Sequence, residues 1–189
     1  MSMSTAEETE ALSKELGSSS NIQQLTFGVA LPQSVGHETD LPEPVRQLMG
    51  DAGIVGSILL LKNSAMIWLG WGHVDTRSGS TTVEGRGIPN MGSVVVGFPR
   101  TKYKGVGNGE ASCSQLVGGD SEDSILGWQM AGRLSQQLGY PIFVSCALFA
   151  SDPQDWMAGL DKHAVTQRAA ALAERKVRQL LKEQAAATK

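Results

Sequence analysis

Apolar positions along the chain fall into two kinds of run, and both predict strands. Across residues 22–31 they occupy every second position, which is typical of a strand with one buried face. The runs at 54–61, 65–71 and 91–97 are instead nearly continuous in Ile, Leu, Val, Met and Trp, so both of their faces are apolar. Residues 62–64 join the first two of these runs by a hairpin-length connection, which predicts an antiparallel pair.

The clearest helix start lies at Asp120 or Ser121, either of which can cap the first unpaired N–H groups. Glu122 and Asp123 follow and suit the positive end of the helix dipole. Gly139 supplies the stop. The stripe predicted to face the core consists of Leu126, Met130, Leu134 and Leu138, joined by Ile125 and Ala131.

Short strands are predicted at 112–117 and 142–149, on either side of that helix, and a last helix runs from Asp161 to Gln184. The fold class is therefore α+β, with about six strands in a mainly antiparallel sheet packed with two main helices. Two helices can cover one face of such a sheet, yet several strands are apolar on both faces. The other face is covered either by a second protein or by the chain's own loops and N-terminal segment.

Domain organisation follows from composition along the 189 residues. We expect a disordered acidic leader at 1–20, a single domain at 21–184 and a frayed tail at 185–189. Long loops rich in Gly, Ser and Thr or in Gly and Lys are predicted at 72–89 and 98–111.

Charge and composition narrow the function classes. With 19% charged residues and a net charge of −3, the chain lacks the concentrated basic excess of a general nucleic-acid binder. No apolar run approaches the ~20 residues that span a bilayer. The N-terminus has no secretory or transit character. Cys113 and Cys146 are too few for a disulfide framework, so we expect reduced thiols in a cytoplasmic, or also nuclear, protein.

Candidate chemistry is sparse. The Gly-rich segment at 105–109 lacks the Gly-Lys-Ser/Thr ending of a phosphate loop, and no helix follows it. The turn at 118–121 precedes a helix, but its acidic residues would repel an anion. No histidine has metal-ligand spacing to another histidine or a cysteine. We therefore predict no catalytic residue, no metal and no cofactor.

Two alternatives stay open from the residues alone. One is a small hydrolase-type enzyme that uses Ser or Cys113 or Cys146 with a histidine, because folding can join residues that are distant in sequence. The histidines are His37, His73 and His163. The other alternative is a protein-interaction adaptor of another kind.

The order and spacing of several segments resemble the proteasome assembly chaperone 4 family. The segments are Ser112–Asp123 with its strand and Gly-Gly-Asp turn, the Arg133-Leu134 pair late in the helix, the strand Pro141–Ser145 and the upstream Met66–Gly70. Together with 90–97 and the final helix, the similarity extends from about Ile22 to Leu181. The leader and the two long loops depart from the compact family pattern and are more similar to plant members.

The resemblance implies a chaperone without enzymatic activity, which pairs with a proteasome assembly chaperone 3-like subunit and helps proteasome α-subunits form their ring. It also implies an antiparallel sheet with helices packed against it. It implies neither nucleic acid nor membrane as a partner.

We expect the partner interface where large apolar side chains fall on the predicted strands and on the first helix. They are Trp68, Trp71, Leu116, Val117, Trp128 and Met130. The basic side of the last helix predicts electrostatic contacts with an acidic α-subunit surface through Arg168, Arg175 and Arg178.

Overall fold

The computed structural model describes residues 22–30, 52–74, 91–100, 111–119, 121–149 and 161–187. The predicted leader, most of both long loops, and Asp120 and His37 lie outside these ranges. In chain order the elements are β1 (Gln23–Ala30), β2 (Ala52–Leu61), β3 (Ser64–His73), β4 (Ser93–Phe98), β5 (Ser112–Val117), α3 (Ser121–Leu138), β6 (Ile142–Ala147) and α4 (Lys162–Ala187).

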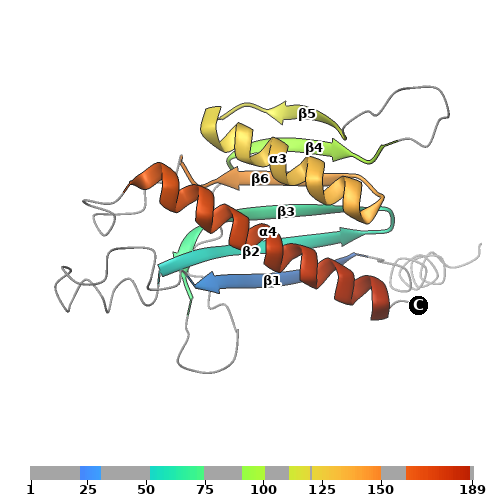
Figure 1. Cartoon of the computed structure of the whole chain (residues 1–189). Coiled ribbons are helices and arrows are strands. Elements are labelled where there is room, and N and C mark those ends of the chain that lie inside the picture. The colour runs from blue at the N-terminus through green and yellow to red at the C-terminus, as the bar shows by residue number, and fades with distance from the viewer. Residues whose placement is uncertain are drawn as a thin grey trace, which may run out of the picture.

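The strands form one six-stranded sheet in the order β1-β2-β3-β6-β4-β5 (Figure 1). Four of the five neighbouring pairs are antiparallel, and β3 and β6 are parallel. The predicted α+β class with a mainly antiparallel sheet and two helices is thus confirmed in the described chain. The hairpin predicted between β2 and β3 is also confirmed.

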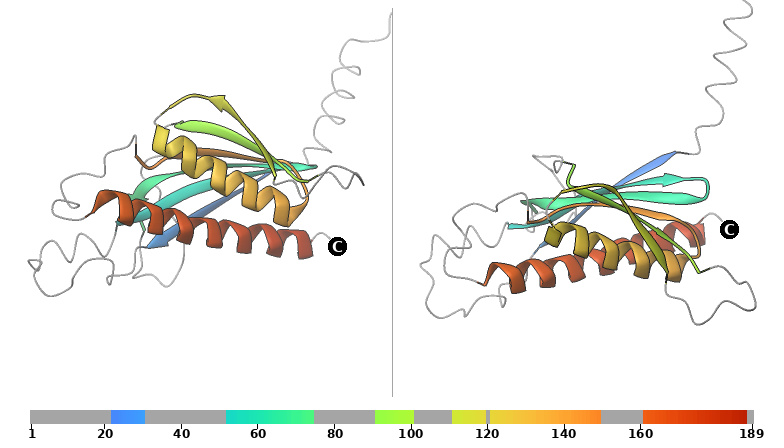
Figure 2. Two further views of the ribbon diagram at one scale, coloured as in Figure 1. Left: turned by 45° about the horizontal axis from the view of Figure 1, so that its top comes forward. Right: turned by 90° about the horizontal axis from the view of Figure 1, so that it is seen from above.

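Both helices lie on the same face of the sheet, as the view from above shows most clearly (Figure 2). Helix α3 contacts β4, β5 and β6, and α4 contacts β1 and β2. We call this side the helix face and the other side the open face. Among the described residues no helix lies on the open face.

The core lies between the sheet and the helix face. Cross-strand pairs such as Ile54–Trp71 and Ile58–Ile67 place their side chains on one side of the sheet, because paired residues share a face. Ile54, Ile58 and Ile67 are fully buried in one cluster with residues of both helices. In β1 the alternation predicted from the sequence is confirmed, since Phe27 is buried in the same cluster.

The helix ends follow local chemistry. Asp161 Oδ1 accepts hydrogen bonds from the N–H groups of His163 and Ala164 at 3.1 and 3.2 Å and so caps the start of α4. Gly139 has φ +79°, and its N–H donates to the carbonyl of Ser135 at 2.8 Å. This left-handed residue ends α3, as the sequence predicts. Neither described helix has the length and apolar content needed to cross a bilayer.

Candidate protein-interaction surface

The open face is apolar, but its central side chains are already packed. Val94 and Val96 of β4 and Val55 of β2 point to this face and are buried. Met66 and Trp68 of β3 are half-buried there. The centre of the open face therefore carries both buried and half-buried apolar side chains.

Four of the exposed large apolar side chains among the described residues belong to one edge of the sheet and to the helix beside it. Leu116 and Val117 of β5 are 55% and 45% exposed, and Ile125 and Trp128 in the first half of α3 are 55% and 44% exposed. Strand β5 is an edge strand that pairs only with β4, and α3 contacts it from the helix face. We call these four residues the β5 edge surface.

Polar contacts fix α3 against this edge. Gln115 Nε2 donates to Ser124 Oγ at 3.2 Å, and Ser124 Oγ donates to Ser93 Oγ at 3.0 Å. The Cys113 thiol lies 3.7 Å from the Trp128 carbonyl oxygen. The first half of α3 is therefore hydrogen-bonded to both β4 and β5. These bonds hold the strand and the helix of the β5 edge surface in a fixed relative position.

Of the six residues predicted for the partner interface, three lie together in the structure and the other three lie elsewhere. Leu116, Val117 and Trp128 all belong to the β5 edge surface. Trp68 lies half-buried on the open face, two strands from β4. Trp71 points to the helix face, where its Nε1–H donates to the Leu148 carbonyl at 2.8 Å, and Met130 is 2% exposed in the core.

Ile125 is a surface residue that the sequence reasoning missed. The prediction that Ile125 belongs to the core stripe of α3 is wrong, since more than half of its side chain is exposed. Leu126 and Met130 occupy the inward face, and Ile125 precedes Leu126 by one position, which rotates its side chain by about 100° away from the sheet. Its spacing of three residues from Trp128 was the available signal, because i and i+3 lie on the same side of a helix.

A groove of about 440 Å³ runs between α3 and α4 on the outer surface of the helix face. Arg133 of α3 spans it through two hydrogen bonds from Nε and Nη2 to the carboxylate of Glu174, at 3.0 and 2.6 Å. These bonds raise the pKa of the Arg133 guanidinium. Arg175 and Arg178 of α4 also line the groove, whereas Arg168 is exposed on α4 outside it.

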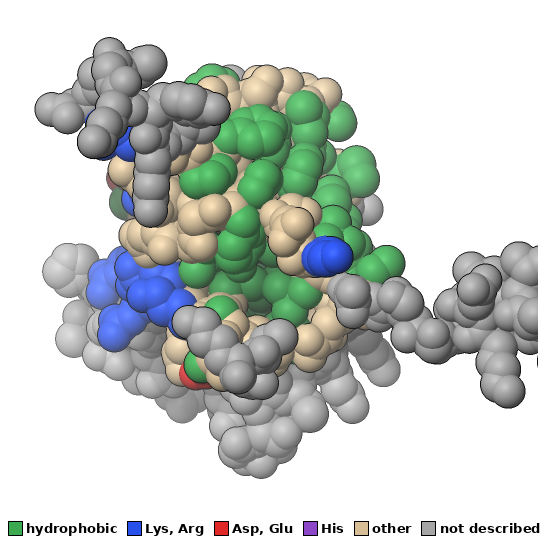
Figure 3. All heavy atoms as spheres, turned by 90° about the vertical axis from the view of Figure 1, so that its right-hand side faces the viewer, with side chains coloured by type: hydrophobic (Ala, Val, Ile, Leu, Met, Phe, Trp, Pro, Cys, Tyr) green, Lys and Arg blue, Asp and Glu red, His purple; other side chains and the backbone are tan. Residues whose placement is uncertain are grey.

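Figure 3 shows the molecule from the end that carries the β2–β3 hairpin, where basic and hydrophobic side chains lie on different sides. Lys and Arg side chains cluster on the side of the helices, and hydrophobic side chains dominate the side away from them. At this end of the molecule the helix side is therefore basic and the side of the open face is apolar.

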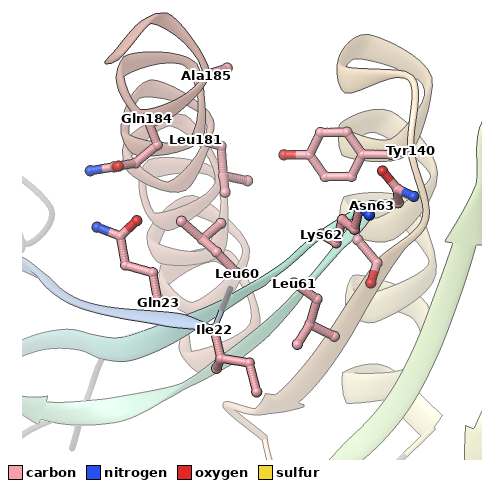
Figure 4. A pocket seen from close by; sticks show the side chains of 11 residues that line it. Ile22, Gln23, Leu60, Leu61, Lys62, Asn63, Tyr140, Leu181, Gln184 and Ala185 are labelled. Atoms are coloured by element: carbon pink, nitrogen blue, oxygen red, sulfur yellow. The ribbon is translucent and has the colours of Figure 1, made fainter. Parts of the chain in front are cut away.

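A second hollow of about 560 Å³ lies at the hairpin end of the sheet, between the start of β1, the β2–β3 turn and the end of α4. In Figure 4 Tyr140 projects from beyond the end of α3 toward Leu181 of α4, and Gln23 and Gln184 lie on the far wall. Burial raises the pKa of Tyr140 above its ordinary value of 10.0. Lys62 is the sole charged residue among the lining residues that the structure describes.

The described cysteines are poorly suited to nucleophilic chemistry, because the thiolate is the reactive form. Burial raises the pKa of Cys113. Burial, and next the negative charge of Asp123, raises the pKa of Cys146 well above its ordinary value. His163 contacts Gln167 at 2.7 Å and Glu122 at 3.6 Å, and no hydrogen bond joins it to a described cysteine. The His73 side chain is not described.

The described residues contain no group of three or more His, Cys, Asp or Glu side chains that could hold a metal ion. The surfaces that they do form are an apolar strand edge and a basic groove. Both are suited to contact with another polypeptide.

Comparison with known families gives one match, to the model of proteasome assembly chaperone 4 over residues 53–148. That range begins in β2 and ends just beyond β6. It includes α3 and the three strands at the β5 side of the sheet, which are β6, β4 and β5. No curated protein matches the chain.

Proposed function

Since the chain belongs to the proteasome assembly chaperone 4 family, we propose that it pairs with a proteasome assembly chaperone 3-like subunit and promotes α-ring formation of the proteasome core particle. Family membership supports the assembly-chaperone role itself. The partner, the α-subunits and the absence of catalysis are parts of the proposal.

The β5 edge surface is the observation that carries the proposal. An exposed edge strand presents unpaired N–H and C=O groups to which another chain can add. Here that edge is flanked by Leu116 and Val117 on the strand and by Ile125 and Trp128 on the helix. Backbone pairing would give the partner its alignment, and the apolar side chains would provide the free energy of association.

The magnitude favours a stable rather than a passing contact. Full burial of a large apolar side chain contributes about 1.5–3 kcal/mol relative to its exposed state. The four side chains of the β5 edge surface are each roughly half exposed, so their remaining exposed area could contribute several kcal/mol in total, on the order of half that amount per residue. Trp128 has the residue type that most often dominates such interfaces.

Co-expression with a chaperone 3-like subunit tests the pairing directly. The complex should be recovered through a tag on either subunit and elute as a 1:1 heterodimer. The variant Leu116→Glu/Trp128→Ala places a charge on the edge and removes its largest side chain, so it should abolish recovery of the partner.

Ile22→Glu is the matched control, because Ile22 is 58% exposed at the opposite edge of the sheet beside β1. It should leave the heterodimer intact. Equal loss of the partner with both variants, or equal retention, would contradict the assignment of the interface to the β5 edge. Failure of the unmodified chain to bind any chaperone 3-like subunit would contradict the pairing itself.

The α-ring role has a separate readout. Depletion of the chain from cells should lower the amount of complete α-rings relative to free α-subunits, and the unmodified chain should restore it. Rescue by the Leu116→Glu/Trp128→Ala variant to the full level would show that α-ring formation does not depend on the proposed pairing.

A further inference from the structure

The groove between α3 and α4 has a charge that its own residues do not neutralise. Its lining includes Arg133, Arg175 and Arg178, and Glu174 is the single acidic residue among the described residues that line it. Glu174 is already engaged by Arg133. Arg175 has no ion-pair or hydrogen-bond partner among the described residues, and Arg178 has a contact of 3.5 Å to the neutral Gln137.

The floor of the groove is apolar and shallow. Leu126 and Met130 of α3 and Ala170 of α4 are buried beneath it, and Ala171 lies exposed at its rim. The two alanines have small side chains, which leaves room above them. Gln129 and Gln167 add neutral hydrogen-bonding groups on the two walls.

The contact between Arg133 and Glu174 shows that an arginine of the groove can bind a carboxylate. The guanidinium binds a carboxylate through parallel N–H···O bonds, which is the arrangement that Arg favours with acidic groups. The side chain of Arg133 is nevertheless 52% exposed. Glu174 therefore occupies part of the cationic rim, while Arg175 is exposed, Arg178 is half-buried, and neither has a carboxylate partner among the described residues.

We propose that this groove binds an acidic segment of a partner protein, with carboxylates of that segment on Arg175 and Arg178 and its apolar carbon atoms over the alanine and methionine floor. The occupant is argued from charge complementarity. A nucleic acid fits less well, because the described part of the lining contains no aromatic side chain on which a base could stack. The groove lies on the helix face, so an acidic segment can bind while the β5 edge surface is engaged.

The effect of replacing Glu174 on the affinity for an acidic segment tests the proposal, because a general change of charge on α4 would alter that affinity by less. Glu174 competes with an incoming carboxylate for Arg133 and repels it at short range. Glu174→Gln should thus strengthen binding of an acidic segment, although it removes an ion pair from the folded chain. Loss of a structural contact alone would weaken binding or leave it unchanged.

The experiment uses the full chain and a fluorescein-labelled 15-residue helical peptide in which Glu alternates with Ala and Leu, followed by anisotropy. A second peptide with every Glu replaced by Gln is the probe control. The Glu peptide should bind at least tenfold more tightly than the Gln peptide. Its binding should weaken between low and high salt, because the pairing groups are exposed.

Two double charge reversals on α4 separate the groove from the helix as a whole. Arg175→Glu/Arg178→Glu should weaken binding by about tenfold or more, since charge-assisted hydrogen bonds are lost and repulsion replaces them. Arg168→Glu/Lys182→Glu makes the same change in net charge on the same helix outside the groove lining, and should alter binding by no more than about twofold. Glu174→Gln should tighten binding by about threefold. Far-UV circular dichroism and thermal midpoints verify that each variant is folded.

Several results would overturn the proposal. They are equal binding of the two peptides, equal loss with the two double reversals, or weaker binding with Glu174→Gln. Displacement of the peptide by a single-stranded oligonucleotide at lower concentration than by the unlabelled peptide would assign the groove to nucleic acid.

Binding that emerges only when Glu7, Glu8, Glu10 and Glu15 are all replaced by Gln would show that the chain's own N-terminal segment is the occupant, and would equally overturn a partner protein. The measurement needs neither the chaperone 3-like subunit nor proteasome subunits. Its failure is therefore distinct from a failure of the proposed pairing.

Discussion

The carboxylate of Asp123 in the first turn of α3 accepts a hydrogen bond from the backbone N–H of Leu148, 2.8 Å away and just beyond the end of β6. The same oxygen accepts a second bond from the N–H of Phe149 at 2.9 Å. Asp123 is fully buried. A single acidic side chain thus ties the start of the helix to the end of a strand 25 residues later.

Asp123→Ala should destabilise the chain by roughly 3 kcal/mol, because two backbone N–H groups would lose their acceptor in a region from which water is excluded. Urea unfolding followed by tryptophan fluorescence measures this loss. Asp123→Asn retains one oxygen acceptor for these N–H groups but replaces the other carboxylate oxygen by an NH2 group, so it should cost less than the alanine variant. A change below about 0.5 kcal/mol for the alanine variant would contradict the account, since that is the range of ordinary surface substitutions.

Cys146 predicts a loss of stability at alkaline pH. Its thiol lies 3.4 Å from Asp123 Oδ1, and burial, with the charge of Asp123, raises its pKa well above the ordinary 9.0. In the unfolded chain the thiol ionises near 9.0, while the folded chain keeps the proton. The unfolded state therefore binds fewer protons above that pH, and the free energy of unfolding falls as the pH rises, by about 1.4 kcal/mol per unit from this group.

Because the unfolded thiol ionises near 9.0, this group should lower the free energy of unfolding by about 1.4 kcal/mol in total between pH 8 and pH 10. Urea titrations at these two pH values should show that decrease in the unmodified chain and a smaller decrease in Cys146→Ala. The stability that the buried thiol contributes is fully present below about pH 9. Cys113→Ala is the comparison, because that thiol is only partly buried and should account for a smaller share. An unchanged slope in Cys146→Ala would rule out the thiol as its source.

The strands were predictable because their apolar runs are bounded by Gly, Pro and polar clusters. The order of the strands in the sheet was not predictable from these runs. Strand β6 inserts between β3 and β4 and pairs in parallel with β3, and nothing in the local pattern of Ile142–Ala147 specifies that position. It depends on α3, which carries the chain from the β5 edge back to the middle of the sheet.

The residues of α3 show how far exposure could be predicted from the sequence. Met130 lies on the repeat formed with Leu126 and Leu134, and that repeat alone indicates a core position. Trp128 lies off the repeat and is exposed, as expected for an interface residue. The role of Asp123 depends on the amide groups of Leu148 and Phe149, which only the folded chain brings close, so the sequence indicated no more than a favourable charge at a helix start.

The ion pair between Arg133 and Glu174 should contribute little to stability despite its good geometry. Its two side chains are 52% and 13% exposed, so solvent screens much of the attraction. A double-mutant cycle with Arg133→Ala and Glu174→Ala should give a coupling energy of about 0.5–1 kcal/mol at low salt. High salt should reduce it. A coupling energy above about 3 kcal/mol would mean that the pair is a main structural tie between the helices, and would weaken the case that Arg133 is available to an incoming acidic group.

Gly97 in β4 controls how closely α3 packs on the sheet. A Cβ atom at this position would run into the backbone carbonyl of Ala131, and neither the strand nor the helix backbone can yield easily. Gly97→Ala should therefore push α3 outward and cost about 1–3 kcal/mol, as overpacking of a core does. Gly118→Ala is the matched control, because the nearest atom to its added Cβ is Gln115 Nε2 at 3.8 Å, an ordinary contact.

The displacement of α3 has a second consequence, at the β5 edge surface. Trp128 is carried by the same helix, one turn before Ala131, so Gly97→Ala should also weaken recovery of the chaperone 3-like subunit at a temperature where the variant is still folded. Urea unfolding and co-purification measure the two effects in parallel. If Gly97→Ala were as stable as Gly118→Ala and bound the partner equally well, then the close approach of α3 to β4 would not be what positions Trp128.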